Sequence, residues 1–261
     1  MNIKQFLFID ESGSPDFYGK RKRPLWLEDN FSPVLLMGLL ATPHRKKLRK
    51  TVQAFQEKIL ADPLYNSIYS VRQPNWFLHA KDDHPEIRIQ FFELIRQLDF
   101  IDCHIILARK IPQLFHTKHN SNAKEFYFDV LYNMLQQFPF EQKQHYQLYL
   151  SRRDSTNSNP FSDAINKTIS RLTKDGSTPF CTYNCDVVKA NQYPELSVLD
   201  YLLWAVQRYI LKRERRFLTA LEGKFNLIYD VYDLNAENRF YNIKNPFLLE
   251  KASSFTKKNE Y

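Results

Sequence analysis

Two adjacent carboxylates, Asp10 and Glu11, follow the apolar run Phe6–Ile9 in the stretch FIDESGS near the N-terminus. A run that is apolar on both faces is typical of a central strand, and ligands gather at the carboxyl ends of strands in α/β sheets. Because neighbouring side chains on a strand point to opposite faces, only one of the two carboxylates readily faces a given site. Asp, Ser and Gly also end strands as ordinary turn residues. The pair is therefore either a strand terminus or part of a metal site.

A third carboxylate, Asp200, lies in the segment PELSVLDYLLWAVQR, where apolar residues recur at helical spacing. At about 100° per residue, Asp200 and Gln207 fall on the edge of the buried stripe. A carboxylate at the margin of a buried face costs free energy to desolvate unless a positive group meets it. A divalent cation or an arginine would each meet that need. The expected stripe consists of Leu199, Leu202, Leu203, Val206 and Ile210.

Carboxylates gathered at one place favour a hard divalent cation. Mg²⁺ and Mn²⁺ prefer carboxylate oxygens and retain waters. Two such ions ~4 Å apart can activate a water and stabilise the leaving oxygen of a phosphodiester. Zinc is not indicated, because the sequence contains no HExxH motif and no Cys/His quartet. His116 and His119 have a metal-like spacing, but without other ligands nearby they are expected to be surface residues.

The elements that must position these residues alternate between strands and helices, which favours a single α/β domain over residues 1–261. Asp83 or His84 is expected to cap a helix that begins at Pro85. The C-terminal fifty residues are expected to hold one more helix or strand, and the tail from about 250 to 261 to fray. Strands are expected at 6–9, 33–40, 101–108, 146–150 and 181–190, and helices at 45–60, 85–98, 123–137, 160–173 and 194–212.

The composition excludes several classes of protein. Hydrophobic residues make up 43% of the 261 residues and charged residues 25%, as in an ordinary globular protein. With only five glycines and neither GxGxxG nor GxxxxGK[ST], a dinucleotide fold or P-loop is not expected. Three cysteines without a CxxC pair fit a reducing cytosol. No apolar stretch approaches the ~20 residues that span a bilayer, and the N-terminus lacks a signal-peptide layout. We therefore expect a soluble, cytoplasmic protein without a membrane partner.

The charge balance points to an anionic partner. Lys and Arg total 37 against 29 acidic residues, which gives a net charge of +8 and makes nucleic acid the first candidate. His79 and Lys81, in FLHAKDDH, either orient a water or contact phosphate, or they belong to a plain loop before the capped helix. The basic clusters either follow a phosphate backbone or form solvated faces; they are Lys20–Arg23, Arg45–Lys50, Arg152–Arg153 and Lys212–Arg216.

FIDESG after an apolar strand, combined with LSVLDYLLWAVQR in a late helix, resembles the family catalogued as domain of unknown function 3800. The segment FLHAKDD is also similar to a family segment, and the resemblance covers roughly residues 4–215. The family commonly has Gln three residues before the helix aspartate, where this chain has Ser197. The resemblance implies a ribonuclease-H-like fold, in which helices flank a mixed central sheet. Three antiparallel strands come first, then helix, strand, helix, strand and helix, here with a helical insertion at about 43–100 between strands two and three.

The resemblance also implies which carboxylates act. In that fold, carboxylates come from the first strand, the first helix, the fourth strand and the last helix. Asp10 and Asp200 occupy the first and last of these places, and Asp154 in LSRRDS fits the third. The remaining ligand is Glu11, Glu125 or Asp129, with Glu11 ranked first because the family motif contains it.

These residues imply a metal-dependent nuclease, a hydrolase that uses Mg²⁺ or Mn²⁺ to cleave RNA or DNA. The first alternative is a ribonuclease-H-like nucleic-acid-binding module without turnover, against which the retention of Asp10, Asp154 and Asp200 argues mildly. The second is an aspartate-nucleophile phosphatase of the haloacid dehalogenase type. That chemistry needs a second Asp two residues after the first, and Ser12 stands there instead.

Overall fold

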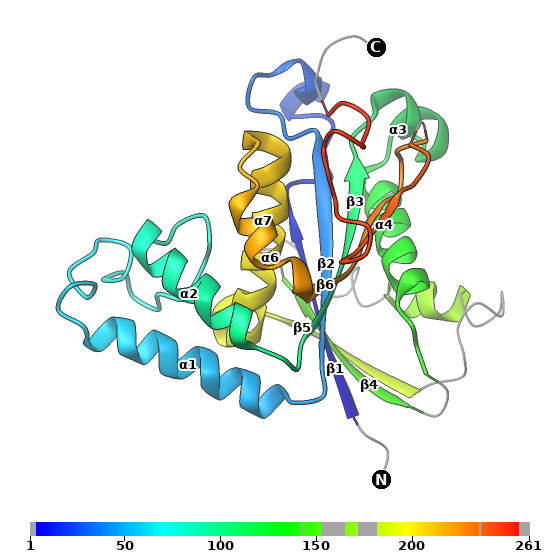
Figure 1. The fold of residues 1–261 in the computed structure, drawn as a ribbon. Helices are drawn as coiled ribbons and strands as arrows, with labels where there is room; N and C mark the ends of the chain where they lie inside the picture. Colours follow the sequence, from blue (N-terminus) through cyan, green and yellow to red (C-terminus); the bar gives the residue numbers. More distant parts are fainter. Residues whose placement is uncertain (1–3, 142–143, 153–164, 172–181, 235, 256–261) are drawn as a thin grey trace.

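A mixed sheet of seven strands forms the centre of the protein (Figure 1). The computed structural model describes residues 4–141, 144–152, 165–171, 182–234 and 236–255. Within these residues the strand order is β5-β4-β1-β2-β3-β6-β7. β2 is antiparallel to both β1 and β3, β4 is parallel to β1 and β5, β6 is parallel to β3, and β7 is antiparallel to β6. The strands are β1 (Lys4–Ser12), β2 (Val34–Thr42), β3 (Asp102–Arg109), β4 (His145–Ser151), β5 (Thr182–Val188), β6 (Phe225–Asp230) and β7 (Phe240–Tyr241).

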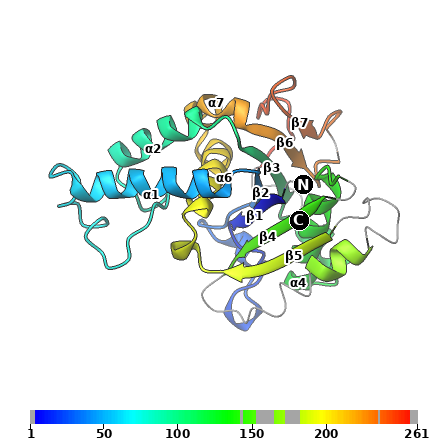
Figure 2. The same ribbon diagram turned by 90° about the horizontal axis from the view of Figure 1, so that it is seen from below.

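Helices cover both faces of this sheet, and Figure 2 shows α1, α2, α6 and α7 on one side and α4 on the other. Each face has its own hydrophobic core, because the central strands are apolar in both directions. The helices are α1 (Arg45–Ala61), α2 (Pro85–Gln97), α3 (Pro112–Lys118), α4 (Ala123–Gln137), α6 (Pro194–Lys212) and α7 (Arg216–Ala220). Residues 165–171 are also helical, and short 3-10 turns lie at Lys20–Lys22, Leu25–Leu27, Ala190–Gln192 and Glu222–Lys224.

The expected α/β architecture, with helices flanking a mixed sheet and a helical insertion between strands two and three, is confirmed. The insertion holds α1 and α2 and projects to one side of the sheet (Figure 1). His84, one of the two residues expected to cap α2, accepts a hydrogen bond from the backbone N–H of Glu86 at 3.5 Å. The helix expected at 160–173 is seen over its described part, 165–171. No helix in the described parts of the chain is long and apolar enough to cross a bilayer.

Side chains alternate between the two faces of the sheet along β1, and this alternation decides on which face Asp10 and Glu11 lie. Phe8 belongs to the core beneath α6, whereas Leu7 and Ile9 belong to the core beneath α4. Since side chains alternate on a strand, Asp10 shares the face of Phe8, and Glu11 shares the face of Ile9. The first carboxylate of the pair therefore faces α6.

A glycine in β2 lets α6 come close to the sheet. Gly38 is the register partner of Asp10. A Cβ at Gly38 would lie 2.7 Å from Cδ1 of Leu199 and 3.0 Å from Cδ2 of Leu203, closer than side chains pack. The missing side chain therefore brings the helix that carries Asp200 against the strand beside Asp10.

The insertion is attached to α6 by a buried ion pair. Glu195 is fully buried and accepts hydrogen bonds from Nε of Arg45 and of Arg49, each at 3.0 Å. Arg45 also donates to the hydroxyl of Tyr149 and lies over its ring, 4.3 Å from the centroid. Two members of the Arg45–Lys50 cluster therefore hold α1 to α6, which is a third role besides a solvated face or a phosphate contact.

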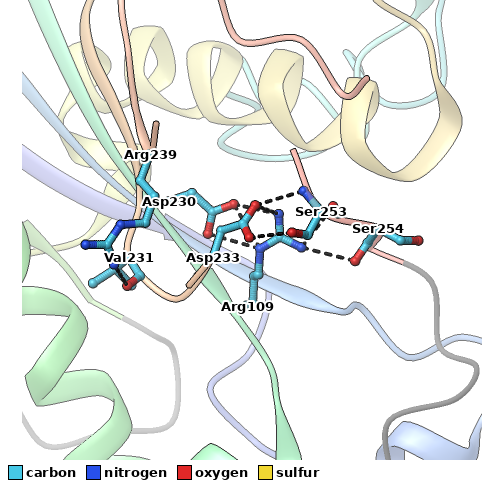
Figure 3. A network of polar contacts seen from close by, with 7 residues as sticks. All are labelled: Arg109, Asp230, Val231, Asp233, Arg239, Ser253 and Ser254. Carbon is cyan, nitrogen blue, oxygen red and sulfur yellow. Dashed lines mark hydrogen bonds and ion pairs between the residues drawn. The ribbon is translucent and has the colours of Figure 1, made fainter. Parts of the chain in front are cut away.

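The C-terminal part of the chain adds more than the single element expected of it. α7 covers one face, and β6 and β7 extend the sheet beyond β3. Arg109, at the end of β3, donates to both Asp230 and Asp233, and its guanidinium also donates to the carbonyls of Ser253 and Ser254 (Figure 3). This network ties down the first residues of the tail that was expected to fray from about 250, while 256–261 lie outside the described residues.

Candidate functional site

A cavity of about 350 Å³ lies at the carboxyl end of β1, between the strand and the N-terminal half of α6. It brings together residues from four parts of the chain that are far apart in sequence. Asp10 and Asp200 both line it, so the strand-end carboxylate and the helix-margin carboxylate share one site. The residues that line it include Asp10, Phe77, His79, Arg152, Ser197 and Asp200.

The Asp10 carboxyl group is held in a place that disfavours its charge. Burial raises its pKa well above the ordinary value, and the negative charges of Glu11 and Asp200 raise it further. A hydrogen bond from its neighbour's backbone N–H, 2.9 Å from Oδ1, and one from Ser151 act in the opposite direction. Because burial and like charge dominate, a cation beside this group would relieve an unfavourable arrangement.

Asp200 is bound at both oxygens by the segment before α2. Its Oδ2 accepts a hydrogen bond from the backbone N–H of Ala80 at 2.7 Å, and its Oδ1 lies 3.6 Å from Nε2 of His79. Burial raises the pKa of this carboxyl, His79 and the backbone N–H lower it, and Asp82 raises it. The partner that the carboxylate at the helix margin was expected to require is thus a histidine together with a backbone N–H.

The segment from Trp76 to Asp83 is folded around one buried carboxylate. Asp83 accepts hydrogen bonds from the indole N–H of Trp76 at 3.1 Å, from the backbone N–H of His79 at 2.8 Å and from the hydroxyl of Tyr201 at 2.6 Å. The segment is therefore fastened to α6 by two adjacent helix residues, Asp200 and Tyr201. This fastening places His79 in the cavity, with Nδ1 2.9 Å from Oδ2 of Asp82.

Ser197 contributes a polar atom that has no partner. It is 3% exposed, and its hydroxyl finds no hydrogen bond within the described residues. It lies one helical turn before Asp200 and lines the same cavity. A buried hydroxyl without a partner costs free energy, so this group is available to a ligand in the cavity.

The three candidates for a further ligand lie elsewhere or on the other face. The Glu11 carboxylate accepts a hydrogen bond from the hydroxyl of Tyr127 on α4 at 3.2 Å, although Glu11 also contributes to the cavity lining. Glu125 accepts from the side chain of Asn120. Asp129 accepts from Lys118 at 2.6 Å, lies 3.2 Å from Nε2 of His119, and accepts from the hydroxyl of Tyr232.

The cluster around Asp129 corrects one expectation. His119 is only 2% exposed and is not a surface residue. Burial by itself would raise the pKa of Asp129, but the hydrogen bonds from His119, Lys118 and Tyr232 outweigh it and lower that pKa. The cluster joins the turn between α3 and α4 to the end of β6, which gives it a structural role.

Two predicted site residues, Arg153 and Asp154, lie outside the described residues. Within the described ones, no group of three or more His, Cys, Asp or Glu side chains is placed to hold a metal ion. Mg²⁺ is commonly bound through only one or two carboxylates, with waters and substrate phosphates completing its shell. Asp10 and Asp200 line one cavity together with the Ser197 hydroxyl, which has no hydrogen-bond partner among the described residues, and could supply such a partial shell.

A second cavity, of about 490 Å³, continues from the first along α6. The two share Asp200 and His79, and the second adds the basic side chains of Lys81, Arg208 and Lys212. Arg208 is paired with Glu214 at 2.6 Å, whereas Lys81 and Lys212 are exposed and have no ion pair within the described parts of the chain. Together with Arg152, these side chains give the carboxylate site a basic rim.

Comparison with known proteins gave no assignment: no protein-family model matches the chain, and no match was found among curated proteins.

Proposed function

We propose that the protein is a metal-dependent nuclease with a ribonuclease-H-like fold, related to the family catalogued as domain of unknown function 3800. The order of the described elements supports this fold. Three antiparallel strands, β1 to β3, are followed by α4, β4, the helical residues 165–171, β5 and α6. Helices α1 and α2 form the insertion, and β6 and β7 are additions at the far edge of the sheet. The proposed setting is the cytoplasm.

The observation that carries the proposal is the meeting of Asp10 and Asp200 in one cavity, with the pKa of each carboxyl raised. Two half-buried carboxylates in one cavity, of which Asp200 raises the pKa of Asp10, are unfavourable in a purely structural role. Groups perturbed in this way cluster at functional sites. A divalent cation between them, with a substrate phosphate, would replace repulsion by attraction.

The chemistry proposed for the site is hydrolysis of a phosphodiester. Asp10 and Asp200 would hold Mg²⁺ or Mn²⁺, and such a cation supplies Lewis-acid stabilisation and lowers the pKa of a water. His79 and the backbone N–H of Ala80 orient the Asp200 carboxylate. The hydroxyl of Ser197 can donate to a phosphate oxygen or water in the cavity, and Arg152 and Lys81 attract the phosphate backbone at its rim.

A second candidate is a nucleic-acid-binding module with this fold and without turnover. One observation favours it: among the described residues, no group of three or more His, Cys, Asp or Glu side chains is placed to hold a metal ion. The basic rim of the cavity would serve either function. The two candidates therefore differ in their response to metal.

The test compares wild type with Asp10→Asn and Asp200→Asn in thermal melting with and without Mg²⁺ or Mn²⁺. A ligand that binds only the folded state raises the melting temperature, so the metal should stabilise wild type and neither variant. A cleavage assay on single-stranded, duplex and hybrid substrates should show turnover for wild type alone. Both variants should retain nucleic-acid affinity, because Asn keeps the size of the side chain and removes only the charge.

The matched control is Asp99→Asn, which removes a carboxylate from an exposed position outside both cavities. It should keep the metal response and the turnover of wild type. If wild type gains no stability from either metal and cuts none of the substrates, the nuclease is excluded in favour of the binding module.

A further inference from the structure

Phe77 is an aromatic side chain that the protein does not use in its core. Its neighbours Trp76 and Leu78 both pack in the core beneath α6. Phe77 belongs to neither core cluster of the described residues and is half-buried as a wall of the carboxylate cavity. Its ring contacts His79 edge-on, with centroids 6.1 Å apart and an interplanar angle of 66°.

The position of Phe77 is fixed by its surroundings. The chain is held on both sides of Phe77 by hydrogen bonds to Asp83. The indole of Trp76 donates one of them, and the backbone N–H of His79 donates the other. The backbone that carries the ring is therefore held in place before a ligand binds, and ordering a mobile segment is one of the main costs of binding.

The cavities also define where a phosphate chain can run. Arg152 lies at one side of the carboxylates, in the cavity that holds Phe77. Lys81 and Lys212 lie in the second cavity, beyond Asp200. A strand that follows both cavities would pass Asp10, Asp200 and Phe77, because all three line the first cavity and Asp200 also lines the second.

Resting on the proposed function, we infer that the substrate enters as a single strand whose unpaired base stacks on Phe77. Within a duplex, the faces of a base are covered by its neighbours in the stack. Only an unpaired or extruded base can offer its face to a ring on the wall of a cavity. Stacking on an aromatic ring tolerates every base, so this contact selects strandedness and not sequence.

The experiment measures binding in metal-free, low-salt buffer, in an Asp10→Asn background that leaves the substrate uncut. The probes are single-stranded DNA, single-stranded RNA and a DNA duplex of one sequence, followed by fluorescence anisotropy. Phe77→Leu keeps an apolar side chain and removes the ring, so it should weaken single-strand binding about 5- to 150-fold and leave duplex binding unchanged. Phe77→Trp should restore single-strand binding. A fluorescent base analogue in the strand should be quenched by the Asp10→Asn protein that keeps Phe77 and not by the one that also carries Phe77→Leu.

The control is Tyr69→Leu, which removes an 82% exposed ring outside both cavities and should change nothing. Equal affinity of wild type and Phe77→Leu for single strands, or an equal loss for single strands and duplex, would overturn the inference. If that happens while wild type still cleaves and Asp10→Asn does not, the proposed nuclease stands and only the stacking contact fails. If wild type binds no nucleic acid, both fail.

Discussion

At the scale of single residues, the site is defined by carboxylates that burial and like charge make unfavourable. Asp10 and Asp200 share a cavity, and the pKa of each is raised chiefly by burial. Asp83, nearby, shows the contrasting case. Burial raises its pKa too, but it accepts hydrogen bonds from Tyr201, His79 and Trp76 and is thereby built into the structure. The carboxylates with fewer partners are the ones left for a ligand.

The metal-free stability of the protein should therefore depend on pH through Asp10. Its folded-state pKa is raised above the unfolded value, so the folded state binds the proton more tightly. The stability contributed by this proton is fully present below the unfolded pKa, about 4, and is lost as the pH rises through the folded pKa. The Asp10→Asn variant has no carboxyl group at this position, so it does not lose this stability as the pH rises. We expect the melting temperature of the variant to exceed that of wild type by a margin that grows from pH 4 towards neutrality.

Differential scanning fluorimetry between pH 4 and pH 8, with a chelator present, measures this margin. Added Mg²⁺ should reduce it, because the cation binds only wild type. A structural Asp10 would behave differently: its Asn variant would be less stable at every pH, by roughly 0.5–2 kcal/mol for a residue that caps backbone groups.

At the scale of elements, α6 organises the site. One face of this helix packs on Gly38 through Leu199 and Leu203. Its margin presents Asp200 to the cavity and Tyr201 to Asp83, and its first turn presents Glu195 to the arginines of α1. The helix therefore holds β2, the insertion and the segment before α2 in one arrangement. A small displacement of α6 would move one carboxylate of the pair relative to the other.

Gly38→Ala tests that dependence. The new Cβ would approach Leu199 to 2.7 Å and Leu203 to 3.0 Å, so the leucines must move or the helix must retreat. Overpacking of this kind costs about 1–3 kcal/mol, and we expect a loss of metal-induced stabilisation in addition. Urea unfolding with and without Mg²⁺ measures both. The control is Gly223→Ala, where a Cβ meets nothing within 4 Å and the stability should stay equal or rise slightly.

At the scale of the whole molecule, the C-terminal part closes the fold at the far edge of the sheet. Arg109 is 6% exposed and binds the carboxylates of Asp230 and Asp233. Asp233 in turn accepts hydrogen bonds from the backbone N–H and the hydroxyl of Ser253. Burial, together with the negative charge of Asp233, raises the pKa of Asp230 to about 6 against the attraction of Arg109. The network joins β3, β6 and the last described residues.

Arg109→Met should therefore destabilise the protein strongly. Removal of one partner leaves two buried carboxylates uncompensated, which costs about 3–5 kcal/mol in comparable pairs. Chemical denaturation measures the change, and limited proteolysis should show the C-terminal segment released. The control is Arg96→Met, which removes an ion pair between two half-exposed side chains on α2 and should cost less than about 1 kcal/mol. Equal effects of the two substitutions would refute a special role for the buried network.

The sequence by itself determined the local elements, because helix and strand periodicity depend on residues close together in the chain. The expected helix at 123–137 agrees with α4, and the stripe of α6 is buried as expected, with Asp200 at its margin. Strands 33–40 and 101–108 lie within two residues of β2 and β3. Alternation along β1 also established that Asp10 and Glu11 face opposite ways, although not which of them meets α6.

Only the tertiary structure decided which groups meet. The close approach of α6 to the sheet needs Gly38, and this requirement depends on leucines of a helix far away in the sequence. The partner of Asp200 proved to be His79 together with a backbone N–H, and the helix expected to supply Glu125 or Asp129 holds both in other contacts. The sequence did not predict that β6 pairs with β3. Parallel partners are joined by long connections, so their pairing leaves no pattern among neighbouring residues. Side-chain types and their spacing fix what chemistry is available, whereas long-range register and packing decide where it is assembled.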